Sequence, residues 1–479
     1  MTTTLCATNV FVGDAPLVPQ ATVSHDGGVF TGVNANSCDT SPANTLVIPA
    51  LINAHDHTRP SMTSFGAANM PLETWIARGP FGNSPDPYLT TAVALARAAR
   101  AGCGGMMVHL LKPSGTMAMV DEAVTIARAA ADVGMRMGFA LAVRDQNPIV
   151  YGDSAGVLDA LPDQDRATIA DLFMRPGLST QDYIALVEAI DAAIKGPMTD
   201  VQFGPAGMQW CSQPLLEAIA ERSAATGRRI HMHLLETVYQ RAWADRAFPG
   251  GVVRYMKEIG LLSPRLTLAH CVHATPDELD MIAEAGATIV TNFSSNMYLH
   301  SGLAPVADAH RRGCAIAVGV DGAALDEDDD AIREMRLVHL MHNGTGFDRT
   351  WSRAEFLALA VRHGRRAIGA PGPGLISPGE PADYTVLDIG LLDRDAIMPV
   401  NPLDLLFGRG SAACVREVVV AGRQICRDGQ PTGVDLGAME KELRGLYRAN
   451  LPKFSALAQA WRPFECAVED WFRREGGCC

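Results

Sequence analysis

The sequence predicts an α/β protein: a closed (β/α)8 barrel with a small β-sandwich domain formed by both ends of the chain. Two observations predict the barrel. In the middle of the chain, short apolar runs alternate with longer stretches rich in Ala, Leu, Glu and Arg. Histidines and carboxylates follow directly behind several of these runs, and barrel enzymes build their sites at the carboxyl ends of strands.

We predict eight barrel strands, at residues 45–53, 104–111, 135–143, 199–206, 228–235, 264–270, 287–292 and 315–321. Helical segments lie between them. Two of these, Pro214–Thr226 and Thr275–Glu284, begin with the Pro or Thr and the acidic residues that favour helix starts. Repeated strand and helix units predict a TIM barrel over residues 49–372.

The two ends of the chain have a different pattern. Residues 1–48 and 373–435 contain short alternating runs, such as 382–387 and 415–422, that are typical of antiparallel strands. We expect both segments to meet in one small β-sandwich. Residues 436–479 have helical spacing with Leu, Trp and Phe on one side, which predicts a helical extension that serves for packing.

Composition limits the class of protein. The 479 residues, 48% hydrophobic and 19% charged, are typical of a soluble protein with a large core. The 11 cysteines form no Cys-x-x-Cys pair and no leader is visible, so we expect a cytoplasmic protein. The net charge of −13 argues against nucleic acid and membrane partners and favours neutral or cationic substrates. We expect a homo-oligomer.

A pair of histidines marks the first candidate site. His55 and His57 follow the apolar run at residues 46–52. Side chains two residues apart on an extended chain point the same way, so both imidazoles can reach one cation at about 2.0 to 2.1 Å. The pair therefore predicts a metal site.

Other polar residues stand at equivalent places. His233 and His270 follow the fifth and sixth predicted strands, Asp321 ends the eighth, and Glu236 lies just beyond His233. Imidazole nitrogen and carboxylate oxygen suit borderline cations such as zinc. His109 ends the second strand and either lines the pocket or caps the barrel. All of these positions fall at one end of the predicted barrel.

Several motifs in the same order resemble the amidohydrolase superfamily. The resemblance covers nearly the whole chain. Within the superfamily, the chain is similar to the mononuclear branch, which contains adenosylhomocysteine, guanine and 8-oxoguanine deaminases and triazine chlorohydrolases. The motifs lie at residues 49–57, 71–76, 233–237, 269–273, 292–296, 318–322 and 379–383.

This resemblance implies roles for the site residues. The metal ligands would be His55, His57, His233 and Asp321, while Glu236 and His270, with Asp321, would handle protons and the attacking water. A divalent ion lowers the pKa of a bound water from about 15.7 toward 7. The family's dinuclear members carry a carbamylated lysine after the fourth strand, and residues 201–206 contain none. We therefore expect one ion, Zn first and Fe as the alternative.

The resemblance also implies substrate contacts. Glu73 and Trp75 resemble positions that contact the distal part of the substrate, although a helix start and a packing residue would look the same. Nucleoside-type deaminases of this branch carry a histidine where this chain has Ala206, and Met208 and Trp210 offer apolar or stacking surface. We expect a compact, planar, sugar-free heterocycle or an aryl urea.

Five further features are less directly placed. Gln209 is a candidate edge contact, and Arg59 meets either the substrate or an internal carboxylate. For His231, which we place on the opposite side of its strand, and His273, in a loop, we favour structural roles. The acidic run 326–330 is predicted to be a solvated helix start.

The predicted function is therefore a metal-dependent aminohydrolase that releases ammonia from a nitrogen heterocycle. An alternative keeps the same site but cleaves an amide, urea or carbamate C–N bond, or removes chloride from a triazine. A rival from another class is a catalytically inactive scaffold, which the complete set of candidate ligands argues against.

Overall fold

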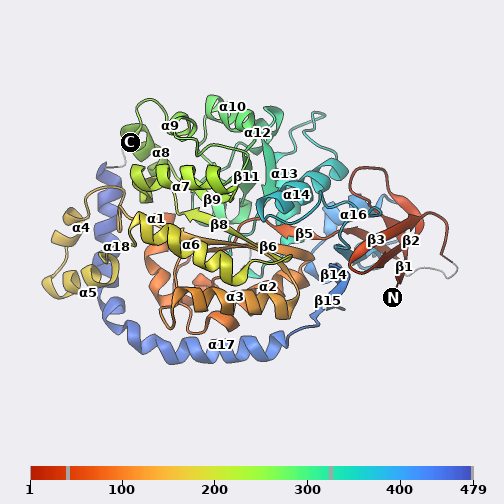
Figure 1. Cartoon of the computed structure of the whole chain (residues 1–479), viewed down its shortest axis with the longest axis horizontal. Helices are drawn as coiled ribbons and strands as arrows, with labels where there is room; N and C mark the ends of the chain where they lie inside the picture. The colour runs from red at the N-terminus through yellow and green to blue at the C-terminus, as the bar shows by residue number, and fades with distance from the viewer. Residues whose placement is uncertain (1, 39–43, 323–326, 476–479) are drawn as a thin grey trace.

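The computed structural model describes residues 2–38, 44–322 and 327–475. A parallel sheet of eight strands lies at its centre, as Figure 1 shows. The strands follow each other in chain order: β5 (Leu51–Asn53), β6 (Cys103–Leu110), β7 (Arg136–Val143), β8 (Thr199–Pro205), β9 (Ile230–Leu234), β10 (Leu266–His270), β11 (Thr288–Thr291) and β12 (Ala315–Val318). Hydrogen bonds from Ala54 N to Val318 O and from Asp321 N to His55 O close the ring. The predicted (β/α)8 barrel is confirmed.

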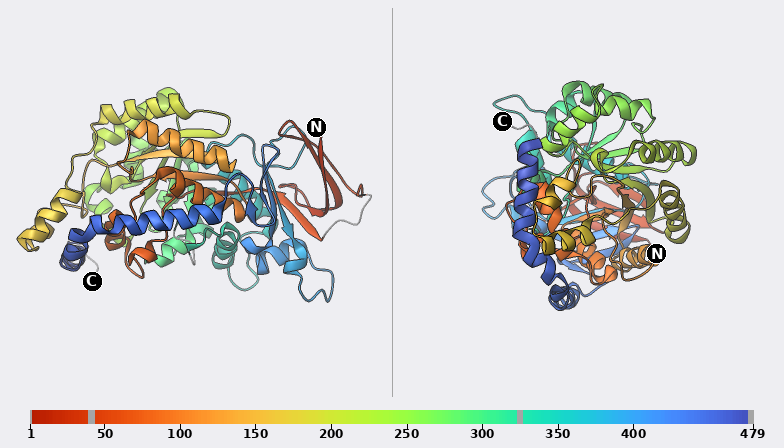
Figure 2. Two further views of the ribbon diagram at one scale, coloured as in Figure 1. Left: turned by 90° about the horizontal axis from the view of Figure 1, so that it is seen from below. Right: turned by 90° about the vertical axis from the view of Figure 1, so that its left-hand side faces the viewer.

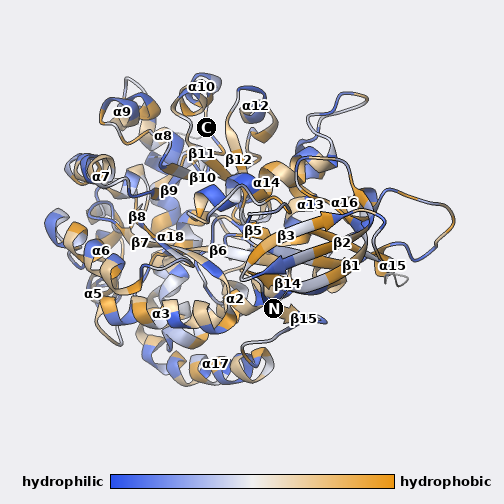
Figure 3. Ribbon diagram, turned by 45° about the vertical axis from the view of Figure 1, so that its right-hand side comes forward, coloured by the Kyte–Doolittle hydropathy of each residue, from blue (hydrophilic) through white to orange (hydrophobic). Residues whose placement is uncertain are grey.

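Helices surround this barrel. They are α1 (Leu72–Trp75), α2 (Pro87–Arg100), α3 (Met119–Val133), α4 (Ala155–Asp159), α5 (Asp163–Phe173), α6 (Thr180–Ile194), α7 (Gln213–Thr226), α8 (Val238–Ala247), α9 (Val252–Glu258), α10 (Pro276–Ala285), α11 (Phe293–Tyr298), α12 (Val306–Arg311), α13 (Ala331–His342) and α14 (Arg353–Ala367). Thr275 begins α10 with a capping box to Glu278, as its sequence predicts. Several outer helices carry both hydrophilic and hydrophobic stretches in Figure 3, as expected of amphipathic helices.

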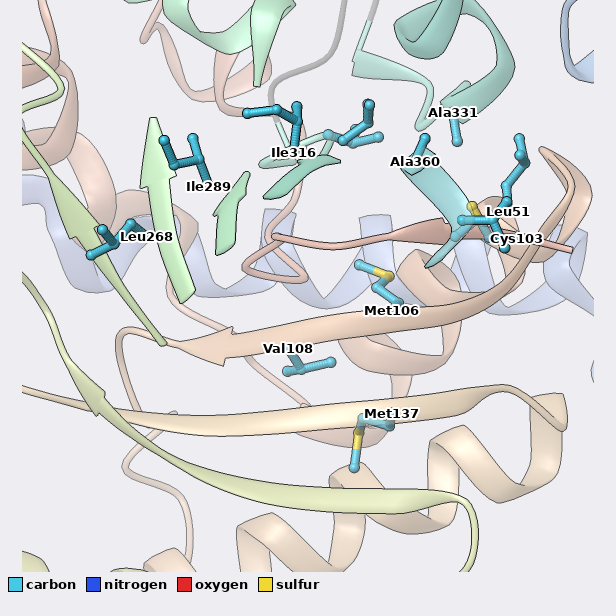
Figure 4. Packing of buried hydrophobic residues seen from close by; sticks show 14 of the residues in the cluster. Leu51, Cys103, Met106, Val108, Met137, Leu268, Ile289, Ile316, Ala331 and Ala360 are labelled. Carbon is cyan, nitrogen blue, oxygen red and sulfur yellow. The ribbon is translucent and has the colours of Figure 1, made fainter. Parts of the chain in front are cut away.

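Alternation along the strands divides the core in two. Leu51, Met106, Ile289 and Ile316 belong to the large cluster that packs the barrel against its helices, and Figure 4 shows these residues, with Ala331 and Ala360 near Leu51. The next residues along the same strands, Ile52, Met107, Val290 and Ala317, form a smaller cluster with Ile368 inside the barrel. The interior side chains of this lower layer are apolar, and the polar site residues lie toward the carboxyl ends of the strands.

The predicted strand at 45–53 is divided. The chain breaks at Ala50 into β4 (Thr45–Pro49) and β5, and β4 pairs outside the barrel with β13 and β1. The whole run is apolar because both halves are fully buried, so hydrophobicity alone gave no sign of the break. The predicted eighth strand also ends earlier, at Val318, and Asp321 lies in the loop that follows.

Both ends of the chain meet in a second sheet of eight strands, in the order β16-β15-β14-β13-β4-β1-β2-β3. Its other strands are β1 (Thr3–Val10), β2 (Val18–Asp26), β3 (Val29–Asn34), β13 (Tyr384–Asp388), β14 (Val415–Val420), β15 (Arg423–Arg427) and β16 (Gln430–Pro431), and α15 (Ile389–Leu392) and α16 (Pro402–Arg409) lie between β13 and β14. Asp383 joins this sheet to the barrel through ion pairs of 2.7 Å with Arg136 and Arg365.

The C-terminal extension runs along the whole barrel. Helix α17 (Leu436–Asn450) lies beside α2, where Arg97 pairs with Glu440 at 2.8 Å. Helix α18 (Ser455–Glu475) then packs on α4 and α5. Figure 2 shows α17 along the length of the barrel and α18 at the end of the molecule opposite β1–β3. Among the described residues, no helix combines the length and apolar character needed to cross a bilayer.

Candidate active site

Three histidine rings converge at the carboxyl end of the barrel, and each is held by its Nδ1 atom. The Nδ1 of His57 donates to the carbonyl oxygen of His109 at 2.7 Å, and that of His233 donates to the carbonyl oxygen of Ala206 at 2.6 Å. Carbonyl oxygens only accept, so the lone pair of each neutral ring lies on Nε2. The two Nε2 atoms face each other at 3.3 Å, an arrangement that a cation between them would stabilise.

Asp321 completes the set. Its Oδ1 lies 3.2 Å from His55 Nε2 and 3.0 Å from His57 Nε2. In a tetrahedral site with bonds of about 2.0 to 2.1 Å, ligand atoms are roughly 3.3 Å apart. The spacing of these atoms therefore fits one small cation. The Nε2 of His55 is buried with no hydrogen-bond partner among the described residues, as expected of a ligand atom.

Burial and charge support this reading. Burial lowers the pKa of His55 to about 3 and also lowers the pKa of His57 and His233, which keeps the rings neutral and able to bind a cation. Burial opposes ionisation of Asp321, but Arg59 and the adjacent rings of His55 and His57 hold its pKa well below the usual value. Arg59 donates to both the carboxylate and the backbone oxygen of Asp321, so it meets an internal carboxylate.

The prediction that His231 points to the opposite side of its strand was wrong. His231 lies two residues before His233 and therefore shares its face, and its Nε2 is 2.7 Å from His55 Nδ1. It orients a candidate ligand. His109 is also inside the barrel: one atom each of His55, His57, His109 and His233 lie within 4.8 Å of one another, as do atoms of a second group of His55, His270 and Asp321.

Glu236 and His270 form a separate pair next to this set. The Oε2 of Glu236 lies 3.7 Å from His270 Nε2, and Ser301 Oγ is 3.4 Å from Glu236 Oε1. His270 Nδ1 contacts Asn296 Oδ1 at 2.8 Å, which leaves Nε2 directed at Glu236. Burial raises the pKa of Glu236, which favours a carboxylate that can hold and release a proton.

Non-glycine residues with positive φ cluster around the site. Thr58, Leu235, His270 and Asp321 have φ of 49°, 50°, 75° and 60°. Such backbone is unfavourable for residues with a Cβ atom and persists where the surrounding structure imposes it. Gly319 allows its backbone to lie close to His55, because a Cβ atom at position 319 would be only 2.9 Å from His55 Cβ. The loops that aim the site residues are therefore tightly specified.

A cavity of about 220 Å³ opens onto these groups. Glu73 and Trp75, both buried, lie on its wall. The Oε1 of Glu73 accepts hydrogen bonds from Tyr151 OH at 3.1 Å and from Thr237, whereas its Oε2 is buried with no partner among the described residues. Burial raises the pKa of Glu73 to about 7. A neutral Glu73 can donate a hydrogen bond from this free oxygen.

The walls of the cavity differ from the expectations in two respects. His109 and Gln209 are buried and are not among the lining residues, so the arrangement does not support a direct substrate contact from either. Lys112 and Arg144 line the outer part, and desolvation and the neighbouring Arg144 lower the pKa of Lys112 to about 8. The lining thus holds basic side chains as well as the carboxylates of Glu122, Glu236 and Asp321.

The sequence analysis gave no individual role to several residues that the structure places at the site. Ser295 donates to the Oδ2 of Asp321, and Asn296 fixes His270. Both belong to a polar segment behind β11, so their position at a strand end was an available signal. Phe464 and Phe472, on the extension predicted to serve for packing, also line the cavity. Helical spacing cannot distinguish a residue that packs from one that also borders a cavity.

The other uncertain residues have structural contacts. His273 lies in a loop, where its Nε2 contacts the carbonyl oxygen of Ser301 at 2.8 Å. In the acidic run, Asp326 lies outside the described residues. Asp330 begins α13 as predicted, but it is buried rather than solvated and accepts from Arg333 N and Ala412 N at 3.0 and 2.9 Å.

Known proteins resemble this chain over most of its length. A 5-methylthioadenosine/S-adenosylhomocysteine deaminase from Nitratidesulfovibrio vulgaris (strain DSM 19637 / Miyazaki F) is 31% identical over 413 residues, which are 86% of each chain. An 8-oxoguanine deaminase from Pseudomonas aeruginosa is 28% identical and covers 82% of this chain and 85% of its own.

Solved structures share the fold. A zinc-bound adenosine deaminase from Xanthomonas campestris superposes with a TM-score of 0.78 at 21% identity, over 94% of this chain and 98% of that one. The atrazine chlorohydrolase of Arthrobacter aurescens, complexed with zinc, gives 0.74 at 20% identity, over 93% and 99%. The amidohydrolase family model matches residues 46–425. The chain therefore belongs to the amidohydrolase family and is a hydrolase.

Proposed function

We propose that this protein is a metal-dependent aminohydrolase that removes an amino group from a compact, planar nitrogen heterocycle and releases ammonia. One observation carries the proposal: Glu236 and His270 stand beside the convergent set of His55, His57, His233 and Asp321, at the inner end of a cavity with aromatic walls. The relatives named as deaminases of 5-methylthioadenosine, S-adenosylhomocysteine and 8-oxoguanine support the same reaction class.

We assign the four convergent residues as ligands of a single divalent ion, with zinc as first choice and iron as the alternative. Three imidazoles and one carboxylate suit such borderline ions. When bound, the ion lowers the pKa of a coordinated water toward 7. No lysine stands in the segment 199–206 at β8 to support a second ion.

The residues of this chain then move the protons. Glu236 takes a proton from the attacking water as the new carbon–oxygen bond forms, and it delivers that proton to the amino nitrogen. The carbon–nitrogen bond breaks and ammonia leaves, while the second proton of the water passes to the adjacent ring nitrogen, so the ring gains an oxo group. His270, fixed by Asn296, stands 3.7 Å from Glu236 and assists this transfer. Glu73 positions the ring by donating from its free Oε2.

The substrate of this reaction is a neutral ring that lies against Trp75 and Trp210, and an aryl urea would take the same place in the alternative reaction. Lys112 and Arg144 at the outer part of the cavity favour substituents that accept hydrogen bonds. A cytoplasmic location and a homo-oligomeric state stay predictions from the sequence.

The test is incubation of zinc-loaded protein with a panel of aminopurines, pterins, chlorotriazines and aryl ureas. Ammonia, chloride and released amine are measured separately, with Glu236→Gln as the inactive control. Ammonia from one or more heterocycles supports the proposal. Release of chloride or aryl amine alone would favour the alternative, a dechlorinase or a urea hydrolase with the same site. Absence of turnover with every compound would contradict both.

A further inference from the structure

We propose that the C-terminal helix α18 forms the distal wall of the substrate cavity, and that Phe464 and Phe472 set the size of the substituent that a substrate can carry. This inference rests on the proposed function, because it concerns the same cavity. It assigns a specificity role to a segment beyond residues 46–425, the part matched by the family model.

The inner face of α18 belongs to an apolar cluster of its own. Phe464 and Phe472 are 0% and 4% exposed and pack with Ala206 and Trp210, which follow β8. Trp210 in turn lies 6.4 Å from the ring of His233, and Ala206 supplies the carbonyl that holds that histidine. This cluster therefore connects α18 directly to the metal-binding end of the barrel.

Each phenylalanine has an aromatic partner that also lines the cavity. The ring of Phe464 lies 5.3 Å from that of Phe173 on α5, and the ring of Phe472 lies 5.0 Å from that of Tyr151. Edge-on and tilted packing of this kind fixes both rings in place. They form a rigid apolar part of the lining of the same cavity that Glu73 and Glu236 line.

A rigid apolar wall selects by size. A substituent one methylene longer than the space allows must displace packed rings, and a single methylene in an apolar pocket changes affinity or kcat/KM by about 10-fold or more. Tyr151 also donates to Glu73, so the wall borders the residue that we assign to ring positioning. Shortening a phenylalanine should therefore widen the range of accepted substrates without removing the catalytic groups.

The experiment uses adenine and its 9-methyl, 9-ethyl and 9-propyl derivatives with the full-length, zinc-loaded protein. Dissociation constants are measured by calorimetry and ammonia release is measured separately. Phe464→Leu and Phe472→Leu should raise the affinity for 9-propyladenine relative to adenine by about 10-fold. Leucine retains apolar packing, so these variants should fold.

Two controls separate the wall from general effects. Leu457→Ala removes buried packing from the same helix and cluster, but Leu457 is not among the residues that line the cavity. The ratio of the affinities for 9-propyladenine and adenine should therefore not change in this variant. Tyr151→Phe removes the hydrogen bond to Glu73 and should affect every member of the series equally.

The outcomes are distinct. A changed affinity ratio without ammonia release would support the wall and would contradict adenines as substrates of the proposed deaminase. Ammonia release with an unchanged ratio in both phenylalanine variants would overturn the wall alone. If neither the natural protein nor any variant binds adenine or its 9-alkyl derivatives, the inference is overturned.

Discussion

The ionisation of Glu73 gives a prediction whose size follows from the structure. Glu73 is 4% exposed, and burial raises its pKa from 4.5 to about 7. The folded state thus holds the proton more tightly than the unfolded state. The stability from this group is fully present below pH 4.5 and is lost as the pH rises to about 7.

The magnitude is limited by the pKa difference. At about 1.4 kcal/mol per pKa unit, the rise amounts to at most about 3 kcal/mol of unfolding free energy. Glu73→Gln keeps the shape of the side chain and cannot ionise. Its unfolding free energy relative to the natural protein should therefore increase by up to about 3 kcal/mol between pH 4.5 and pH 8.

Urea unfolding at several pH values and a fixed zinc concentration measures this difference. Glu334→Gln is the matched control, because burial also raises the pKa of Glu334 to about 7 at a position outside the cavity lining. In both variants, the unfolding free energy should fall less steeply between pH 4.5 and pH 8 than it does in the natural protein. Parallel stability curves for Glu73→Gln and the natural protein would refute the idea that Glu73 is neutral in the cavity.

Three other predictions concern the site. Glu236→Gln should lower turnover by roughly 10² or more while elemental analysis finds the metal retained, and near-normal turnover would remove Glu236 from the mechanism. His231→Phe removes the partner of His55 and should raise the zinc dissociation constant about 10- to 100-fold in a chelator competition, whereas His273→Phe should leave it unchanged; equal affinities would exclude an orienting role. Free heterocycles should have higher kcat/KM than adenosine, because Ala206 offers no side-chain hydrogen bond and an unpaired buried group costs about 1 to 3 kcal/mol; a preference for adenosine would contradict this.

The sequence predicts the barrel well because its physical signals are local. Each of the residues His57, His233 and His270 follows an apolar run, and these runs are strands of the barrel. The carboxyl ends of the strands meet at one end of the ring, which brings the three residues together. Alternation on a strand also determines where His231 points, and correct use of that rule would have placed it on the ligand side.

Other features depend on contacts that are distant in sequence. The break at Ala50 follows from the pairing of β4 with β13, more than 300 residues away. Phe472 borders the cavity because α18 crosses to Tyr151, and Lys112 and Arg144 meet there because two loops converge. A single sequence contains no periodicity that reports such contacts.

The most direct test of the whole account is the metal content of the purified protein and of His55→Ala, measured by elemental analysis on the same preparations. The geometry of His55, His57, His233 and Asp321 predicts close to one zinc or iron per chain in the natural protein and loss of that metal in the variant. Two ions per chain would contradict the single site, and full retention of metal by His55→Ala would contradict the proposed ligand set.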